Sequence, residues 1–391
     1  MRSKLPDVGT TIFTVMSRRA AELGAVNLGQ GFPDYPIDPR IGELVAQAMQ
    51  AGHNQYAPMQ GVPALQQAIA AQLARRHGRT PHDADPSQTI TITLGATEAI
   101  YSAIQACVGA GDEALIFDPA YDSYEPAIRL AGARCVRLPL GPPRFAVDWD
   151  AVRAAIDPRT RLVVINSPGN PSCAVLSQED LATLAALAEA HDLLVISDEV
   201  YSHVVAPGVA HASVLDHPAL ARRAFAIYSF GKSLHATGLR IGYAVAPPAL
   251  TTELRKVHQF NTFTIATPLQ HAIAAYLAER PDVFDGLAPF FDARRGCLRD
   301  ALDGTGLVPL PAQGTYFQLV DYGNCPPLAG LDDVAASMKL LEEGGVASIP
   351  LSPFYRTPPG TSVIRLCFAK QEATLAEAGR RLRAFATAVA A

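Results

Sequence analysis

The chain is organised around the stretch Ser229-Phe230-Gly231-Lys232-Ser233-Leu234-His235-Ala236-Thr237-Gly238-Leu239-Arg240-Ile241-Gly242-Tyr243. Its single lysine, Lys232, lies among small and hydroxyl residues after the apolar run 224–228, and Arg240 follows eight positions later. A lysine in this setting can form a Schiff base with a carbonyl compound, while hydroxyl groups and an arginine hold an anionic group. A loop lysine beside a buried strand has the same local sequence, so the rest of the chain must decide between these interpretations.

From Thr89 onward, short apolar runs alternate with helical patterns, which favours a largely parallel sheet flanked by helices. The pattern predicts strands over 89–94, 114–117, 134–138, 162–165, 193–197 and 224–228, and helices over 99–108 and 178–191. Earlier helices are predicted over 10–24, 40–49 and 63–77, the last with a proline at its start and a glycine after its end. This part of the chain has the pattern of an α/β domain.

The pattern changes after Tyr243 and predicts a smaller α+β unit. Helices are predicted over 248–257, 268–279, 284–302, 332–343 and 372–386, and strands over 314–320, 346–349 and 363–368. The sequence contains no internal repeat and no low-complexity tract, and its 31 prolines are spread along the chain. We therefore expect one large domain and one smaller one.

Composition excludes several classes of function. The 391 residues are 49% hydrophobic and 18% charged, with a net charge of −5, so neither nucleic acid nor an anionic membrane is an expected partner. No apolar run has the length of a membrane span or signal peptide, which favours a soluble, cytoplasmic protein. The six cysteines are scattered without metal-ligand spacing, so we expect no metal site and no disulfide framework.

Polar or glycine-rich residues follow the predicted strands at their carboxyl ends. Five loops share this property: 95–97, 121, 170, 198–201 and 229–240. Ligands in open α/β sheets bind at the edge where the carboxyl ends of the strands meet. The sequence therefore predicts that these loops form one site.

Each loop offers a specific chemical group. Gly95-Ala96-Thr97 precedes a helix, whose free backbone N–H groups and dipole favour a phosphate. Asp198 ends a very apolar strand, where burial raises the pKa of a carboxyl group unless a cation such as a protonated ring nitrogen faces it. Asn170 and Tyr201 can hydrogen-bond a phenolic oxygen, and Tyr121 can stack on an aromatic ring.

The order of these residues along the chain resembles that of the class I/II aminotransferases, pyridoxal-phosphate enzymes with the aspartate aminotransferase fold. The resemblance extends over nearly the whole chain, and four motifs resemble the methionine and kynurenine aminotransferase branch. These motifs are Asn27-Leu28-Gly29-Gln30-Gly31-Phe32-Pro33-Asp34, Tyr121-Asp122-Ser123-Tyr124-Glu125-Pro126-Ala127-Ile128, Ser197-Asp198-Glu199-Val200-Tyr201 and Arg365-Leu366-Cys367-Phe368-Ala369-Lys370. One motif departs from the family pattern Asn-Pro-x-Asn-Pro-Thr-Gly, because the stretch 166–173 ends in Ser172-Cys173.

The resemblance implies roles for individual residues. Lys232 would bind pyridoxal 5′-phosphate covalently and move the proton at the substrate α-carbon, with Asp198 on the ring nitrogen and Tyr201 on the phenolic oxygen. The implied cofactor contacts are Gly95, Ala96, Thr97, Tyr121, Asn170, Asp198, Tyr201, Ser229, Lys232 and Arg240, with Tyr56 reaching in from the neighbouring subunit. The implied substrate contacts are Arg365, which would bind the α-carboxylate through its planar fork, and Gly31, Asn170, Tyr35 and Phe263.

The same resemblance implies the architecture. We expect a large domain with a mostly parallel seven-stranded sheet between helices, known as fold type I, and a smaller α+β domain. The expected boundaries are 1–38 for an N-terminal arm with a small-domain segment, 39–285 for the large cofactor-binding domain and 286–391 for the small domain. A homodimer with shared active sites is the expected working unit.

The predicted activity is transfer of an amino group from an L-amino acid to a 2-oxo acid by a ping-pong mechanism. Aromatic residues near the predicted site, such as Phe13 and Tyr355, favour bulky uncharged substrates of the methionine, aromatic, glutamine or kynurenine type, although Arg18 or Arg19 can also approach a substrate carboxylate. A β-lyase acting on cysteine conjugates is an alternative, because it passes through the same α-carbanion. A catalytically silent cofactor-binding regulator is disfavoured, because Lys232 and Arg365 are both present.

Overall fold

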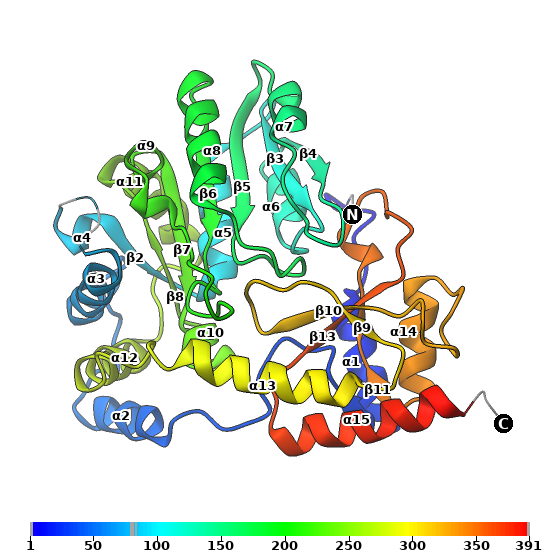
Figure 1. The fold of residues 1–391 in the computed structure, drawn as a ribbon. Coiled ribbons are helices and arrows are strands. Elements are labelled where there is room, and N and C mark those ends of the chain that lie inside the picture. Colours follow the sequence, from blue (N-terminus) through cyan, green and yellow to red (C-terminus); the bar gives the residue numbers. More distant parts are fainter. Residues whose placement is uncertain (1–2, 79–81, 83, 389–391) are drawn as a thin grey trace.

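A seven-stranded sheet forms the centre of the computed structural model, which describes residues 3–78, 82 and 84–388 (Figure 1). Its strand order is β2-β8-β7-β6-β5-β3-β4. The strands are β2 (Ile90–Thr93), β3 (Glu113–Asp118), β4 (Arg134–Pro139), β5 (Thr160–Asn166), β6 (Leu194–Asp198), β7 (Ala224–Ser229) and β8 (Gly242–Val245). Only β8 is antiparallel to its neighbours, β2 and β7. The predicted mostly parallel seven-stranded α/β sheet is therefore confirmed.

Two hydrophobic cores lie on opposite faces of this sheet, because successive side chains of a strand point to opposite sides. On one face, Ile196 and Phe225 pack with helices α5 (Gly95–Cys107), α6 (Tyr124–Leu130) and α11 (Pro248–Asn261). On the other face, Val195 and Ala226 pack with α8 (Gln178–Ala190) and with the larger core. Burial on both faces explains why the strand sequences are continuous apolar runs.

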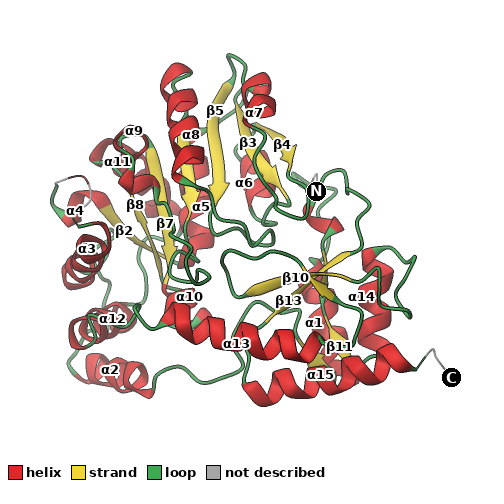
Figure 2. Ribbon diagram, in the orientation of Figure 1, coloured by secondary structure: helices red, strands yellow, loops and turns green. Residues whose placement is uncertain are grey.

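Helices cover both faces of the sheet and continue around one of its edges (Figure 2). Beyond those named above, this part of the chain contains α2 (Pro39–Gln50), α3 (Pro63–His77), α4 (Pro86–Thr89), α7 (Trp149–Ala155), α9 (Pro218–Ala221), α10 (Phe230–Ser233) and α12 (Thr267–Glu279). Helix α3 has the bounds that its sequence predicts: Pro63 opens it, and Gly78 follows with φ +69°, a conformation that glycine adopts without strain.

A second group of elements comes from the two ends of the chain. The strands β9 (Val308–Pro309), β10 (Phe317–Asp321), β12 (Ile349–Pro350) and β13 (Val363–Cys367) form an antiparallel sheet, and β1 (Val26–Asn27) pairs with β11 (Val346–Ala347). The helices are α1 (Ile12–Leu23), α13 (Leu287–Leu302), α14 (Asp333–Glu342) and α15 (Glu372–Thr387). Met16 and Ala20 of α1 pack against Leu341, Ala347 and Ile349, so the N-terminal segment joins the C-terminal elements.

The structure differs from the predicted elements in two respects. The predicted strand 346–349 is divided into β11 and β12, because Val346 and Ala347 pair with β1 whereas Ile349 and Pro350 pair with β13. The short helices α4, α6, α7, α9 and α10 and the two-residue strands β1 and β9 were not predicted, because two to seven residues are too few for a period to be recognised. Among the described residues, no helix is both long enough and apolar enough to cross a membrane.

Candidate active site

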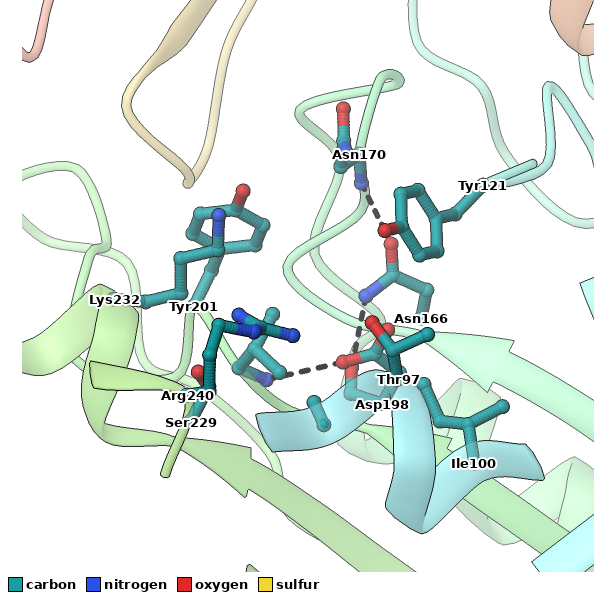
Figure 3. A pocket seen from close by; sticks show the side chains of 12 residues that line it. Thr97, Ile100, Tyr121, Asn166, Asn170, Asp198, Tyr201, Ser229, Lys232 and Arg240 are labelled. Atoms are coloured by element: carbon teal, nitrogen blue, oxygen red, sulfur yellow. Dashed lines mark hydrogen bonds between the residues drawn. The ribbon is translucent and has the colours of Figure 1, made fainter. Parts of the chain in front are cut away.

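A cavity of about 130 Å³ lies where β5, β6 and β7 end and α5 begins (Figure 3). It is lined by Ala96, Thr97, Ile100, Tyr121, Asn166, Asn170, Asp198, Val200, Tyr201, Ser229, Lys232 and Arg240. The structure therefore brings the five predicted loops to one edge of the sheet, as the strand directions require.

Lys232 lies in α10, the single turn that follows β7. Its Nζ is 3.3 Å from the carbonyl oxygen of Gly31 and lies 5.5 Å from the ring centre of Tyr201 and 5.6 Å from that of Tyr316. Burial lowers the pKa of this amine to about 8, with a smaller raising effect from Asp198. A substantial fraction of the amine is thus neutral near physiological pH, and a neutral amine is a nucleophile and a base.

Asp198 is the last residue of β6 and is 4% exposed. Its Oδ2 accepts a hydrogen bond of 2.6 Å from the Tyr124 hydroxyl, and its Oδ1 accepts one of 3.3 Å from the backbone N–H of Val200. Burial raises the pKa of Asp198 to about 6, although these hydrogen bonds oppose the shift. A cation placed in the cavity would favour the ionised carboxylate.

Two asparagines shape the loop after β5. The side-chain oxygen of Asn166 accepts a 2.7 Å hydrogen bond from the backbone N–H of Asn170, and its Nδ2 donates to the backbone carbonyl of Asp198 at 2.9 Å. These two bonds fix the Asn170 backbone relative to the end of β6. Asn170 lies on the lining of the cavity, and its side-chain oxygen accepts a hydrogen bond from Arg365 Nη1.

A cradle for an anion is formed by the first turn of α5 together with Ser229 and Arg240, and we call this group the phosphate cradle: Gly95, Ala96, Thr97, Ser229 and Arg240. Gly95 has φ +73°, so glycine is needed for the turn, and the absence of a Cβ leaves room for the Arg240 guanidinium, whose Nη2 would lie 2.8 Å from one. The backbone N–H groups at the start of α5 have no partners within the helix. A helix N-terminus beside a guanidinium favours a phosphate group.

Arg365 lies on β13 and is 1% exposed. Its Nη1 donates to Asn170 Oδ1 at 2.5 Å and its Nη2 donates to the Gly29 carbonyl at 2.9 Å, while Nε has no hydrogen-bond partner among the described residues. The guanidinium also lies 3.9 Å from the ring centre of Phe317 and 5.1 Å from that of Phe13. Both of these acceptors are neutral, so they do not neutralise the buried positive charge of the guanidinium. An uncompensated buried charge favours the binding of an anionic ligand.

Six of the predicted site residues do not line this cavity: Gly31, Tyr35, Tyr56, Gly95, Phe263 and Arg365. Tyr56 is 83% exposed and its ring packs edge-on against Phe263, with 5.5 Å between the ring centres. Tyr35 lies on the other side of the Lys232 turn, where its hydroxyl is 3.3 Å from His235 Nδ1. The proposed roles of these residues in cofactor or substrate binding remain predictions.

Several residues at the site were not assigned from the sequence. Asn166 and Tyr124 lie within quoted motifs, and their positions beside strand ends are a signal that could have identified them. Ile100, Val200 and Tyr316 carry no comparable signal, because apolar and aromatic residues are usual in a core. Among the described residues, no cluster of His, Cys, Asp or Glu has a geometry that could hold a metal ion.

Comparisons with known proteins agree with this geometry. A family model described as aminotransferase class I and II matches residues 24–382. The chain is 49% identical to methionine aminotransferase of Escherichia coli over 98% of this chain and 97% of that protein, and 34% identical to kynurenine–oxoglutarate transaminase 1 of Mus musculus over 94% and 93%. A crystal structure of an Escherichia coli protein with methionine aminotransferase function superposes with a TM-score of 0.94 at 48% identity, over 98% of this chain and 99% of the other.

Proposed function

The chain belongs to the class I and II aminotransferases, and we propose that it moves the amino group of an L-amino acid with a bulky uncharged side chain to a 2-oxo acid. Membership confirms the enzyme class predicted from the sequence, a transferase that uses pyridoxal 5′-phosphate and acts on amino and oxo acids. Both named relatives are aminotransferases, which favours transamination over β-elimination.

The residues of the cavity fit pyridoxal phosphate in charge as well as in shape. Lys232 and Arg240 line the cavity, Arg365 is bonded to Asn170 beside it, and Asp198 is the carboxylate on the lining. This set would balance a phosphate at the cradle, a substrate carboxylate at Arg365 and a protonated ring nitrogen at Asp198. Nε of Arg365 has no hydrogen-bond partner among the described residues, so the guanidinium keeps an unused donor.

When bound, pyridoxal phosphate supplies an electron-accepting ring that stabilises negative charge at the substrate α-carbon. Asp198 would keep the ring nitrogen protonated, since its carboxylate is buried and is oriented by Tyr124. Lys232 would take the proton from the substrate α-carbon and return it to C4′ of the cofactor, which a primary amine with a pKa of about 8 can do in both directions. Asn170 and Tyr201 would hydrogen-bond the phenolic oxygen, and Tyr121 would stack on the ring.

The substrate carboxylate would bind to the guanidinium of Arg365. Phe13 and Phe317 surround the guanidinium with apolar surface. Of the two arginines that could approach a second substrate carboxylate, Arg19 donates instead to Glu342 and Glu22 at 2.9 and 3.2 Å, and Arg18 is exposed. These contacts favour uncharged side chains, such as that of methionine, over dicarboxylates.

This proposal rests on one observation: Lys232, Asp198 and residues of the phosphate cradle line the same cavity. The purified protein with bound cofactor should lose its visible absorbance when an amino donor is added without any oxo acid. Methionine and phenylalanine should act at least tenfold faster than aspartate, a ratio equivalent to about 1.4 kcal/mol in transition-state binding. Faster reaction with aspartate would reject the proposed substrate class, and absence of any spectral change with every donor would reject the activity.

We propose a homodimer in which Tyr56 of each subunit completes the cradle of the other. Tyr56, Phe260 and Phe263 are 83%, 85% and 43% exposed, and Tyr56 packs against Phe263, so large aromatic side chains are left on the surface of the single chain. Size-exclusion chromatography with light scattering should give twice the chain mass of 41.5 kDa. A monomer that binds cofactor tightly would exclude this role for Tyr56.

Two further assignments belong to the same proposal. The division into residues 1–38, 39–285 and 286–391 is supported by the separate sheets and by the packing of α1 against the C-terminal elements. A cytoplasmic location is supported by the six cysteines, all of which are free thiols. Fractionation of cells that produce the native protein would test that location.

A further inference from the structure

A buried carboxylate lies directly behind the phosphate cradle. Glu98 is 8% exposed and belongs to the first turn of α5. Its Oε2 accepts a 3.2 Å hydrogen bond from the backbone N–H of Leu94, the residue that links β2 to α5. Its Oε1 accepts a 2.6 Å hydrogen bond from the Ser102 hydroxyl, one turn further along the helix. Glu98 thus fixes the turn from which Gly95 and the next two residues face the cavity.

The partner of this carboxylate is His258 of α11, which is completely buried. His258 Nδ1 lies 3.1 Å from Glu98 Oε1, and Nε2 lies 3.1 Å from the backbone carbonyl of Met59. A carbonyl oxygen can only accept, so Nε2 carries a proton and donates it. The distance between Nδ1 and Oε1 is that of a hydrogen bond, so the imidazole holds this carboxylate oxygen.

His258 also holds the chain on the far side of α5. Met59 belongs to the segment 54–61, which carries Tyr56, and the neighbouring Gln60 carbonyl accepts a hydrogen bond from the β2 residue Ile92. The backbone carbonyl of His258 accepts hydrogen bonds from Thr262 and Phe263 where α11 ends. Since Phe263 packs against Tyr56, a single buried histidine connects the cradle with the exposed aromatic pair.

We propose that Glu98 and His258 are positioning residues for cofactor phosphate binding, a role that rests on the proposed function. The carboxylate orients the Leu94–Thr97 turn, and the imidazole holds the carboxylate in place.

The test compares two cofactors that differ only in the phosphate. Apo-protein prepared from the full chain is titrated with pyridoxal phosphate and with pyridoxal, following absorbance and tyrosine fluorescence. Glu98→Gln should raise the Kd for pyridoxal phosphate about tenfold, because a buried charged hydrogen bond is lost, and should leave the Kd for pyridoxal within about twofold. His258→Gln, which keeps a donor for Met59 but cannot reach Glu98, should behave in the same way.

Matched substitutions separate this effect from general destabilisation. Glu179→Gln changes an exposed glutamate in the first turn of α8, and His271→Gln changes a half-buried histidine of α12, so both should bind the two cofactors as the wild type does. If Glu98→Gln does not fold, as judged by circular dichroism, His258→Gln carries the test, with the same expected ratio. Unchanged Kd values, or an equal rise for both cofactors, would overturn the inference. Failure of the wild type to bind pyridoxal phosphate would instead overturn the proposed function.

Discussion

The hydroxyl of Tyr124 donates a hydrogen bond of 2.6 Å to Oδ2 of Asp198, and both side chains are buried. Tyr124 begins α6, whereas Asp198 ends β6, so the contact joins two elements that are 74 residues apart. It gives the carboxylate a fixed orientation before any ligand arrives. Hydrogen bonding to the charged form favours that form, so Tyr124 opposes the rise in pKa that burial imposes on Asp198.

We expect Tyr124→Phe to raise the pKa of Asp198 above its present value of about 6. Cofactor binding that requires the ionised carboxylate is lost as the pH falls through this pKa, so the loss should begin at higher pH in the variant. The Kd for pyridoxal phosphate, measured between pH 5 and 8, should therefore differ from wild type by about tenfold at the acid end, the cost of about one charged hydrogen bond, and by less at pH 8.

Tyr322→Phe is the matched control for this substitution. The Tyr322 hydroxyl also donates a buried hydrogen bond, to the Leu331 carbonyl, but it lies in the C-terminal elements. Its binding profile should coincide with that of the wild type. A Tyr124→Phe profile that also coincides would show that Tyr124 does not influence the carboxylate.

Lys232 should capture the cofactor at a rate that depends on its own protonation. The pKa of the amine is lowered by burial from its usual value to about 8, so the reactive neutral form increases as the pH rises toward 8 and is nearly complete above 9. The rate of absorbance change on mixing apo-protein with pyridoxal phosphate should rise about tenfold per pH unit below the pKa and then level off. Continued increase to pH 10.5 would mean an ordinary exposed lysine.

The Lys232 side chain should also be indispensable for turnover. Lys232→Ala removes the base that moves the substrate proton, and general acid–base catalysis contributes about 10²- to 10⁴-fold. A loss of kcat in this range, with retained binding of pyridoxal phosphate through the cradle, is the expected outcome. Full turnover by the variant would contradict the assignment.

The sequence predicts the site better than it predicts what supports the site. Lys232, Asp198 and Asn170 can be recognised because each follows an apolar strand, and parallel strands bring such residues to one edge. Tyr124 and His258 act through contacts between distant elements, and their residue types are equally common in a core. The division of β11 from β12 depends on which strand each pairs with, and a local pattern of apolar residues does not encode that choice.

Arg365→Lys should weaken binding of every amino acid substrate. Lysine has no planar fork, so it cannot bond Asn170 and Gly29 and still offer two donors to a carboxylate. We expect kcat/KM for methionine to fall about 10²-fold, which corresponds to about 2.7 kcal/mol of lost transition-state binding. An amine without a carboxylate, such as methioninol, should react at the same slow rate with both proteins. Arg380→Lys, on the exposed side of α15, is the control.

At position 173, glycine should give a more stable protein than alanine, which reverses the usual order of these two residues. Cys173 stands where the family pattern has glycine, with φ +59°, while its thiol is fully buried and lies 3.4 Å from the carbonyl oxygens of Pro171 and Phe317. Cys173→Ala loses the thiol and keeps the left-handed backbone, which costs a non-glycine residue about 1 kcal/mol. Cys173→Gly loses the thiol but relieves that cost. Urea denaturation should show the glycine variant to be the more stable by about 1 kcal/mol, and the opposite order would contradict this account.

Arg137 should contribute strongly to stability because it joins the large sheet to the C-terminal elements. From β4, it donates to Asp118 and Glu125 at 2.6 Å each and to the Phe354 carbonyl at 2.7 Å. Arg137→Leu would leave a buried carboxylate, that of Asp118, without its charged partner, and breaking a buried ion pair costs about 3–5 kcal/mol. Urea denaturation should show a loss in this range. Arg153→Leu breaks an exposed ion pair with Asp150 and should cost less than about 1 kcal/mol, so equal losses would mean that Arg137 contributes only as a surface charge.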